Sequence, residues 1–368
     1  MKRKVLLIAV LLTMATAMFS HDMTREELTR RIDEVFATVY HNDEPGAAVL
    51  IMQGNDTIYN RCFGLADMVT REPVTMATNF CIASVSKQFS AVALLQLAEQ
   101  GKLSLNDALS EFFPEFKSPF FKDITLHHIM SHTSGIPDAR PRDDRNFVLY
   151  SNDVTSVQYM RTLDHLNFQP GTRYEYINPT FQLIYQIVER VTGQSFETYM
   201  QENVFDKAGM KTCRYFEPDR PIAHMAHGYA RDAKGNWQEY DYGEESFFGT
   251  KADGALYCSI NDFVSWERAL RDNKVWTAGS KRLAYRPWIQ IPEDAEYGYQ
   301  PHTGYGYGFF VQDVPGRPTH VYHLGDNGGF TIYAGKVPER DLIFLFFSTR
   351  PDIDRLGMVN QVYQLLNR

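Results

Sequence analysis

Hydrophobic and polar positions follow two different periods along the chain. Near the N-terminus, Thr24 and Glu27 have the spacing of a capping box. An amphipathic helical pattern follows, carried by Leu28, Ile32, Val35, Phe36 and Val39. Two β-prone runs, 46–52 and 57–63, then flank Gly54-Asn55-Asp56. This arrangement predicts a helix followed by a β-hairpin.

The middle of the chain, roughly 85–250, is richer in helical patterns and loops. Residues 180–191 contain no glycine or proline and predict a helix that ends at Gly193, and 196–200 predict a second helical piece before Gly209. From Tyr305 onward the pattern predicts strands and a closing helix, at 307–312, 320–323, 330–337, 342–348 and 355–366.

Strands at both ends around a helical middle predict a mixed α/β (α+β) fold, in which helices flank an antiparallel sheet and a mostly helical subdomain is inserted. The sheet part would span about 24–84 and 250–368, and the helical part about 85–249. No linker rich in Pro, Gly or Ser separates these parts, so we expect one compact unit over residues 18–368.

The first 17 residues have the features of a secretory signal peptide. Met1-Lys2-Arg3-Lys4 is basic, 5–12 is apolar but too short for a membrane span, and Ala15-Thr16-Ala17 is a small-x-small cleavage site. We therefore expect an exported protein, periplasmic or secreted, with no membrane association beyond this signal. An uncleaved N-terminal anchor is the alternative.

Charge and cysteine content narrow the possible partners. The formal net charge of −8 becomes about −11 once three basic residues leave with the signal peptide, which argues against nucleic acid or anionic membrane as a partner. The four cysteines, Cys62, Cys81, Cys213 and Cys258, have no C-x-x-C spacing. Export permits disulfides, but the sequence favours buried, unpaired thiols.

Ser84-Val85-Ser86-Lys87 opens an apolar helical run that ends at Gly101, and it is the only S-x-x-K in the chain. Residues i and i+3 share a helix face, so Lys87 would lie beside the Ser84 hydroxyl. A serine needs such a base to act as a nucleophile, and burial would lower the pKa of the lysine towards a useful value. An N-cap serine with a surface lysine has the same spacing.

Two further patterns contain candidate catalytic residues, and each pattern also matches elsewhere in the chain. Tyr176-Ile177-Asn178 offers a phenol and an amide, but Tyr150-Ser151-Asn152 and Tyr40-His41-Asn42 match the same Y-x-N pattern. His323-Leu324-Gly325 falls where a strand is expected to end, and His302-Thr303-Gly304 resembles it. A glycine there lets the backbone approach a substrate closely.

Taken in order, these motifs resemble the serine β-lactamase and penicillin-binding-protein-like hydrolases, in particular the branch of class C β-lactamases, D,D-peptidases and esterases. The resemblance covers nearly the whole mature chain and selects Tyr176 over Tyr150 and His323 over His302. Its segments are Glu44-Pro45-Gly46-Ala47, 78–80, Ser84 to Lys87, 101–105, the H-T-S-G-I-P loop 132–137, Pro170-Gly171, Tyr176 to Asn178, Gly209-Met210, 307–309 and 323–330.

The resemblance implies a β-lactamase/transpeptidase-like fold and acyl transfer without a cofactor. Ser84 would attack a carbonyl, and Lys87 and Tyr176 would relay the proton. Asn178 would hold the substrate and Lys87, and the backbone N–H groups of Ser84 and Asp326, after the small Gly325, would form the oxyanion hole.

Three residues depart from the β-lactamase pattern. His323 replaces a lysine that recognises the β-lactam carboxylate, although it could donate a hydrogen bond to substrate or to Tyr176. Asp326 adds an acid beside the oxyanion hole, which would disfavour anionic substrates. Arg350, after the last strand, could supply a positive charge for a carboxylate or form a salt bridge at the rim.

Three further features of the sequence each have a structural and a functional interpretation. His127, His128 and His132 include an i, i+4 pair, but no H-E-x-x-H or cysteine pairing supports a metal site. Residues 285–310 are unusually aromatic and could line a cleft or simply fill the core. Asp253-Gly254-Ala255 resembles a family turn, with a catalytic carboxylate as the alternative.

The sequence therefore predicts an exported serine hydrolase for a small ester or amide, an esterase or D-amino-acid peptidase rather than an efficient β-lactamase. The partner would be a small-molecule or peptide substrate, and the oligomeric state is left open. The alternative is a penicillin- or peptidoglycan-recognising sensor or binding protein that does not turn over.

Overall fold

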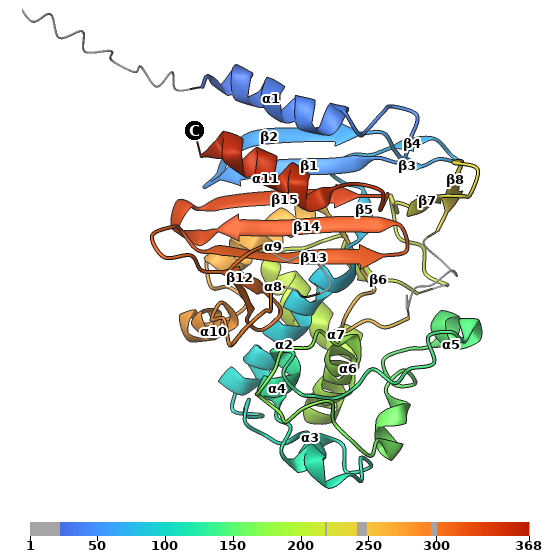
Figure 1. Ribbon diagram of the computed structural model, residues 1–368, viewed down its shortest axis with the longest axis vertical. Coiled ribbons are helices and arrows are strands. Elements are labelled where there is room, and N and C mark those ends of the chain that lie inside the picture. Colours follow the sequence, from blue (N-terminus) through green and yellow to red (C-terminus); the bar gives the residue numbers. More distant parts are fainter. Residues whose placement is uncertain (1–22, 218, 241–248, 294, 296–299, 368) are drawn as a thin grey trace, which may run out of the picture.

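A large antiparallel sheet forms the centre of the protein (Figure 1). The computed structural model describes residues 23–217, 219–240, 249–293, 295 and 300–367, so the predicted signal peptide lies outside these ranges. The eight strands run in the order β10-β11-β12-β13-β14-β15-β1-β2. They are β1 (Ala47–Gln53), β2 (Asp56–Phe63), β10 (Ile289–Gln290), β11 (Thr303–Tyr305), β12 (Phe310–Gln312), β13 (His320–Asn327), β14 (Phe330–Val337) and β15 (Leu342–Ser348).

Strands from the two ends of the chain meet within this sheet, close to its β2 edge. β1 pairs with β15, Ala47 opposite Ser348, and with β2 across the predicted hairpin. The expectation of an antiparallel sheet assembled from both ends of the sequence, with helices around it, is confirmed.

Both faces of the inner strands are buried, which explains why β1 and β15 are apolar at nearly every position. In β15, Phe344 and Phe346 pack towards the helices α1 (Arg25–Ala37) and α11 (Arg355–Leu366), while Phe347 contacts the opposite layer. Successive strand residues point to opposite faces, so each strand contributes to two separate cores. Figure 1 shows α11 in front of the sheet and α9 behind it.

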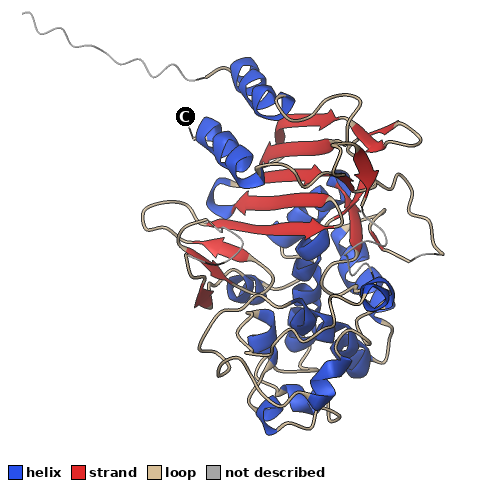
Figure 2. Ribbon diagram, turned by 45° about the vertical axis from the view of Figure 1, so that its right-hand side comes forward, coloured by secondary structure: helices blue, strands red, loops and turns tan. Residues whose placement is uncertain are grey.

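The remaining helices lie mostly beyond the second face, where Figure 2 shows them gathered below the sheet. They are α2 (Lys87–Glu99), α3 (Leu109–Phe112), α4 (Leu126–Met130), α5 (Arg145–Tyr150), α6 (Asn178–Thr192), α7 (Phe196–Met200), α8 (Asp206–Ala208), α9 (Ile260–Arg271) and α10 (Ala278–Ala284). Short helical turns are η1 (Ala83–Ser86), η2 (Pro119–Lys122), η3 (Gln158–Thr162), η4 (Gln201–Phe205) and η5 (Pro338–Arg340). Of the helices within the described ranges, none combines the length and the apolar character needed to cross a membrane.

Three small sheets complete the fold. One of them has the order β5-β9-β6. It pairs β5, which comes shortly before α2, with β9 from the later part of the chain. Their strands are β3 (Leu65–Asp67) with β4 (Glu72–Pro73), β5 (Asn79–Cys81) with β9 (Leu256–Ser259) and β6 (Arg214–Tyr215), and β7 (Tyr229–Arg231) with β8 (Trp237–Glu239).

Local predictions from caps and periods are largely confirmed. The Thr24 hydroxyl accepts a hydrogen bond from the Glu27 N–H at the start of α1, and Gly193 ends α6 with a φ of 72°. Two strand predictions were wrong at their ends. Gly308, with a φ of 76°, turns the chain, so β12 begins only at Phe310. β13 extends through Asn327, so the H-x-G pattern lies inside a strand and not at its end.

The favoured interpretation of the cysteines as unpaired was wrong for two of them. A disulfide joins Cys213 and Cys258, beside the contact between β6 and β9, whereas Cys62 and Cys81 take part in no disulfide. Sequence spacing could not reveal this pair, because its members are 45 residues apart and come together only through the pairing of the strands.

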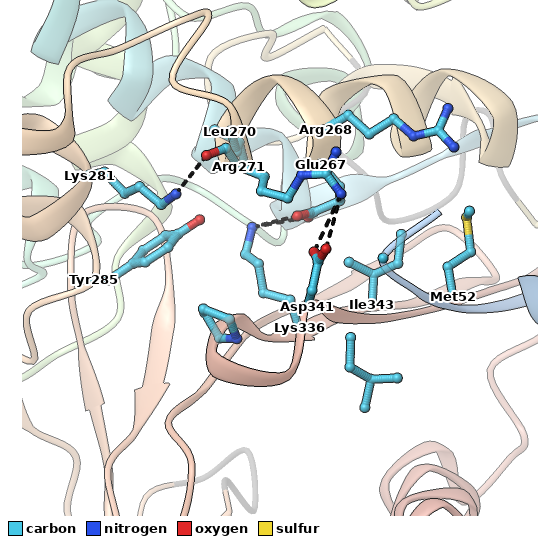
Figure 3. A pocket seen from close by; sticks show the side chains of 13 residues that line it. Met52, Glu267, Arg268, Leu270, Arg271, Lys281, Tyr285, Lys336, Asp341 and Ile343 are labelled. Carbon is cyan, nitrogen blue, oxygen red and sulfur yellow. Dashed lines mark hydrogen bonds and ion pairs between the residues drawn. The ribbon is translucent and has the colours of Figure 1, made fainter. Parts of the chain in front are cut away.

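A buried ion pair connects the sheet to α9. Figure 3 shows Lys336 of β14 reaching Glu267 of α9 in a pocket that Tyr285 and Lys281 also line. The Lys336 Nζ donates to both carboxylate oxygens, at 2.8 and 3.1 Å, and both residues are at most 7% exposed. Burial lowers the pKa of Lys336 despite the neighbouring carboxylate.

This pair gives a stability prediction. Lys336→Met leaves the Glu267 carboxylate buried without its partner, so the free energy of unfolding should fall by about 3–5 kcal/mol. The double variant Lys336→Met/Glu267→Leu should recover most of this loss, because it buries no unpaired charge. Urea unfolding of the wild type, both single variants and the double variant measures the effect. A Lys336→Met protein as stable as the wild type would contradict it.

Candidate active site

Ser84 lies in η1, at the turn that leads from β5 into α2, so the predicted start of the helix is confirmed. Its predecessor Ala83 has a φ of 47°, a conformation that costs energy for a residue with a side chain. The edge of β13 approaches this turn so closely that a Cβ at Gly325 would collide with the Ile82 carbonyl oxygen. Glycine at position 325 is therefore required for β13 to lie against the serine turn.

Lys87 is completely buried and its Nζ has three oxygen partners. Nζ lies 2.9 Å from Ser84 Oγ, 2.8 Å from Asn178 Oδ1 and 3.0 Å from the Asp253 carbonyl oxygen. A protonated amine can donate to all three oxygens. A neutral amine has two hydrogens, which Asn178 and Asp253 can accept, and its lone pair then faces the Ser84 hydroxyl. The geometry therefore suits a lysine that accepts the serine proton.

The electrostatic surroundings favour this neutral form. Burial lowers the pKa of Lys87 to about 8, and the charge of Arg140 adds to the effect, while Asp253 opposes it. About half of the Lys87 side chains are therefore uncharged at pH 8, whereas a lysine in water is almost fully protonated there.

Tyr176 is held beside this lysine by aromatic packing. Its ring centroid lies 5.0 Å from Lys87 Nζ, 4.2 Å from the ring of His132 and 6.3 Å from the ring of Phe310. The decoy Tyr150 is 77% exposed at the end of α5. The structure thus brings Tyr176, and not Tyr150, to the serine–lysine pair.

His323 is a neutral, fully buried side chain. Its Nδ1 lies 2.7 Å from the Leu324 carbonyl oxygen and so carries the hydrogen, which leaves Nε2 to accept from the Tyr305 hydroxyl at 3.1 Å. Burial, together with the positive charge of Lys87, lowers the pKa of His323 to about 3. Because both ring nitrogens are engaged in these bonds, this arrangement differs from the expected donation to substrate or to Tyr176.

The two charged residues expected near the substrate are placed differently from each other. Asp326 lies at the pocket, where it forms an ion pair with Arg355. Arg350 is not brought to the pocket: it donates to Glu44 and to both oxygens of Asp352, and 7% of its side chain is exposed. The salt-bridge alternative describes Arg350 correctly, because these carboxylates occupy its guanidinium.

One pocket, open to solvent, joins the elements of the site. It connects the serine turn, the start of α6, β12, β13 and the start of α11. Its lining consists of Ser84, Tyr176, Asn178, Phe310, His323, Leu324, Asp326 and Arg355. Seven of the eight residues that the sequence singled out therefore lie at this pocket or directly against it. Lys87 lies beneath Ser84, and Gly325 packs against the serine turn.

Sequence reasoning missed several residues that shape the site. His132 brackets Tyr176, since its Nδ1 accepts from the Ile177 N–H and its carbonyl oxygen accepts from the Glu175 N–H. Tyr305 and Phe310 belong to the aromatic segment 285–310, for which lining a cleft and filling the core were the two alternatives; Phe310 lines the pocket, and Tyr305 donates to His323. Arg355 gave no signal, because an arginine at the start of a predicted surface helix is ordinary.

The histidines considered as metal ligands have structural partners. His127 Nδ1 lies 2.6 Å from the Tyr307 hydroxyl, and the Thr125 N–H donates to His128 Nδ1. In the part of the chain that the structure describes, no group of three His, Cys, Asp or Glu side chains could hold a metal ion.

The chain is similar to known proteins over most of its length. The family model described as Beta-lactamase matches residues 25–365. Penicillin-binding protein 4* of Bacillus subtilis (strain 168) is 25% identical over 321 residues, which cover 83% of this chain and 68% of that protein.

Solved structures share the fold. An octameric penicillin-binding protein homologue from Pyrococcus abyssi superposes with a TM-score of 0.77 at 25% identity, covering 93% of this chain and 77% of the other. A D-amino acid amidase from Ochrobactrum anthropi SV3, solved with L-phenylalanine amide, has a TM-score of 0.74 at 20% identity, covering 92% and 97%. The second likeness concerns the fold alone. The expected antiparallel sheet with flanking helices and a β-lactamase/transpeptidase-like fold is confirmed.

The lowered pKa of Lys87 gives a pH prediction. If neutral Lys87 accepts the Ser84 proton, kcat/KM should rise about tenfold per pH unit below pH 8 and level off above it. The two buried histidines of the site cannot produce this rise in kcat/KM with pH. Burial lowers the pKa of His323 to about 3 and that of His132 well below 6.5. A pH profile of ester hydrolysis measures the midpoint. A midpoint near 6.5 would contradict the assignment to Lys87.

Proposed function

The chain belongs to the beta-lactamase family of serine hydrolases, and from this premise we propose that it cleaves a small ester or amide through an acyl-enzyme on Ser84. The observation that carries the proposal is the contact of 2.9 Å between Lys87 Nζ and Ser84 Oγ, at a lysine with a lowered pKa. A serine with an adjacent, partly neutral amine is an activated nucleophile.

In the acylation step, the Ser84 oxygen forms a bond to the substrate carbonyl carbon while its proton moves to Lys87. The bond to the leaving group then breaks, and the leaving group takes the proton, with Tyr176 as the relay beside Lys87. The backbone N–H groups of Ser84 and Asp326 stabilise the oxyanion. Losing one such donor typically costs about 100- to 1000-fold in rate.

In the second step, water attacks the acyl carbon and gives its proton to the same amine, so that Ser84 leaves with a hydrogen and the acid is released. Lys87 then returns to its neutral state. Asn178 holds the lysine in place through both steps, since its Oδ1 accepts from Nζ at 2.8 Å.

The charges at the pocket support an esterase or a D-amino-acid peptidase rather than an efficient β-lactamase. His323 is neutral where the β-lactamase pattern has a lysine, and Arg350 is occupied by Glu44 and Asp352. No cation in these two positions meets the carboxylate of a β-lactam. Small uncharged esters and amides do not need one.

Export is part of the proposal. The basic start, short apolar run and small-x-small site of residues 1–17 support it, and so does the Cys213–Cys258 disulfide, because disulfides persist in oxidising compartments.

The first test follows intact mass and product release together. The mature protein and its Ser84→Ala variant would each be mixed with p-nitrophenyl butyrate and, separately, with a penicillin. We expect steady release of p-nitrophenol by the wild type, and neither turnover nor adduct with Ser84→Ala. A stable penicillin adduct without ester turnover would favour the non-turnover sensor or a slow peptidase over an esterase.

The proton relay gives a second prediction. Tyr176→Phe removes the hydroxyl but keeps the ring that packs on His132, so kcat should fall by at least about 100-fold while the fold is retained. Tyr150→Phe is the matched control, since the Tyr150 side chain is exposed at the end of α5. The measurement is kcat from steady-state kinetics of the wild type and both variants. A Tyr176→Phe enzyme with wild-type kcat would exclude the relay.

A further inference from the structure

An ion pair on the wall of the active-site pocket has a fixed orientation. Arg355, the first residue of α11, donates from Nη1 to Asp326 Oδ1 at 2.8 Å and from Nη2 to Oδ2 at 3.0 Å. Its Nη1 also donates to the carbonyl oxygens of Gly325 and Ile332, each at 3.1 Å. Bidentate geometry together with two backbone acceptors holds the guanidinium against the strands.

The two charges of this pair are not equally available to a ligand. The Asp326 side chain is 58% exposed, whereas that of Arg355 is 13% exposed. Both line the same pocket as Ser84. A molecule that enters the pocket therefore meets the carboxylate first, while the guanidinium is covered by the groups to which it donates.

We propose that Asp326 and Arg355 form a charge filter, in which Asp326 rejects substrates that carry a carboxylate near the scissile carbonyl and masks Arg355, a carboxylate-binding side chain. The inference rests on the proposed function and names its substrate class: esters or amides that are uncharged or cationic near the reacting bond. Asp326 acts through its exposed charge, and Arg355 acts by holding that carboxylate in place.

The masking has a consequence that simple repulsion lacks. When Asp326 loses its charge, Nη1 and Nη2 of Arg355 lose their carboxylate partner at a site that a substrate carboxylate can reach. The pocket should then change from rejecting an anion to binding one, because a guanidinium pairs with a carboxylate through two parallel hydrogen bonds. Two unit charges a few ångströms apart near a protein surface suffice for about a tenfold change in rate.

The test uses three p-nitrophenyl esters with the same six-carbon acyl chain: the hexanoate, the monoester of adipic acid and the 6-aminohexanoate, whose ends are neutral, anionic and cationic. The quantity compared is the kcat/KM ratio of the adipate to the hexanoate. Taking this ratio within each variant cancels the effects of a substitution on catalysis in general. The wild type should prefer the hexanoate and the 6-aminohexanoate.

Three variants then separate the parts of the filter. Asp326→Asn keeps the backbone N–H and the shape of the side chain, and should raise the adipate ratio by at least about tenfold. Asp326→Asn/Arg355→Gln should lose most of that gain, because the guanidinium is gone. Asp352→Asn is the matched control: it also removes one negative charge from an arginine-paired aspartate, outside the pocket lining, and should leave the ratio unchanged.

Each outcome can be assigned. An unchanged ratio in Asp326→Asn, or an equal rise in Asp352→Asn, would overturn the charge filter while Ser84-dependent hydrolysis of the hexanoate still supports the proposed function. A gain that persists without Arg355 would overturn the masked carboxylate site. Wild-type protein that hydrolyses none of the three esters would overturn the proposed function, and the filter with it.

Discussion

The burial of the Lys87 amine organises the site. Lys87 is fully buried, and its Nζ draws together an oxygen from the serine turn, an amide oxygen from the start of α6 and a carbonyl oxygen from the turn before β9. An amine removed from water needs such partners. A buried donor without a hydrogen-bond partner lowers the stability of the fold by about 1–3 kcal/mol, and a charged donor lowers it by more. The same burial lowers its pKa to about 8. The burial of Lys87 is therefore the reason both for its three oxygen partners and for its ability to accept a proton.

The groups around Lys87 are also either uncharged or paired with an opposite charge. His323 and His132 are buried with lowered pKa values, and Arg355 is balanced by Asp326. With these buried histidines neutral, an oxyanion near the serine turn depends on backbone donors, whose positions the fold fixes before a substrate arrives. Gly325 makes this possible, because a side chain there would hold β13 away from the turn.

The sequence allowed the framework to be predicted, and most of the residues it singled out lie together at the pocket. It failed where contacts between distant parts of the chain determine the structure. Periodicity located the central strands and α11, because these elements are long and regular. Short strands such as β10 and β11 have too few residues to show a period, and they are held by their neighbours. The disulfide and the bond from Lys87 to the Asp253 carbonyl oxygen join residues distant in the sequence. Arg350 and Arg355 look alike in sequence, and only their partners show which one lies at the pocket.

The position of Arg355 connects the two faces of the sheet. α11 packs with α1 on the face opposite to α2, yet its first residue reaches the carbonyl oxygens of Gly325 in β13 and Ile332 in β14, beside the serine turn. The cluster that fixes α11 includes Val359, Val362 and Phe344. Since a helix is a rigid element, packing on the far face sets where the guanidinium lies. The charge presented to a substrate thus depends on a core that never touches it, so variation in that core can change specificity without altering the reacting groups.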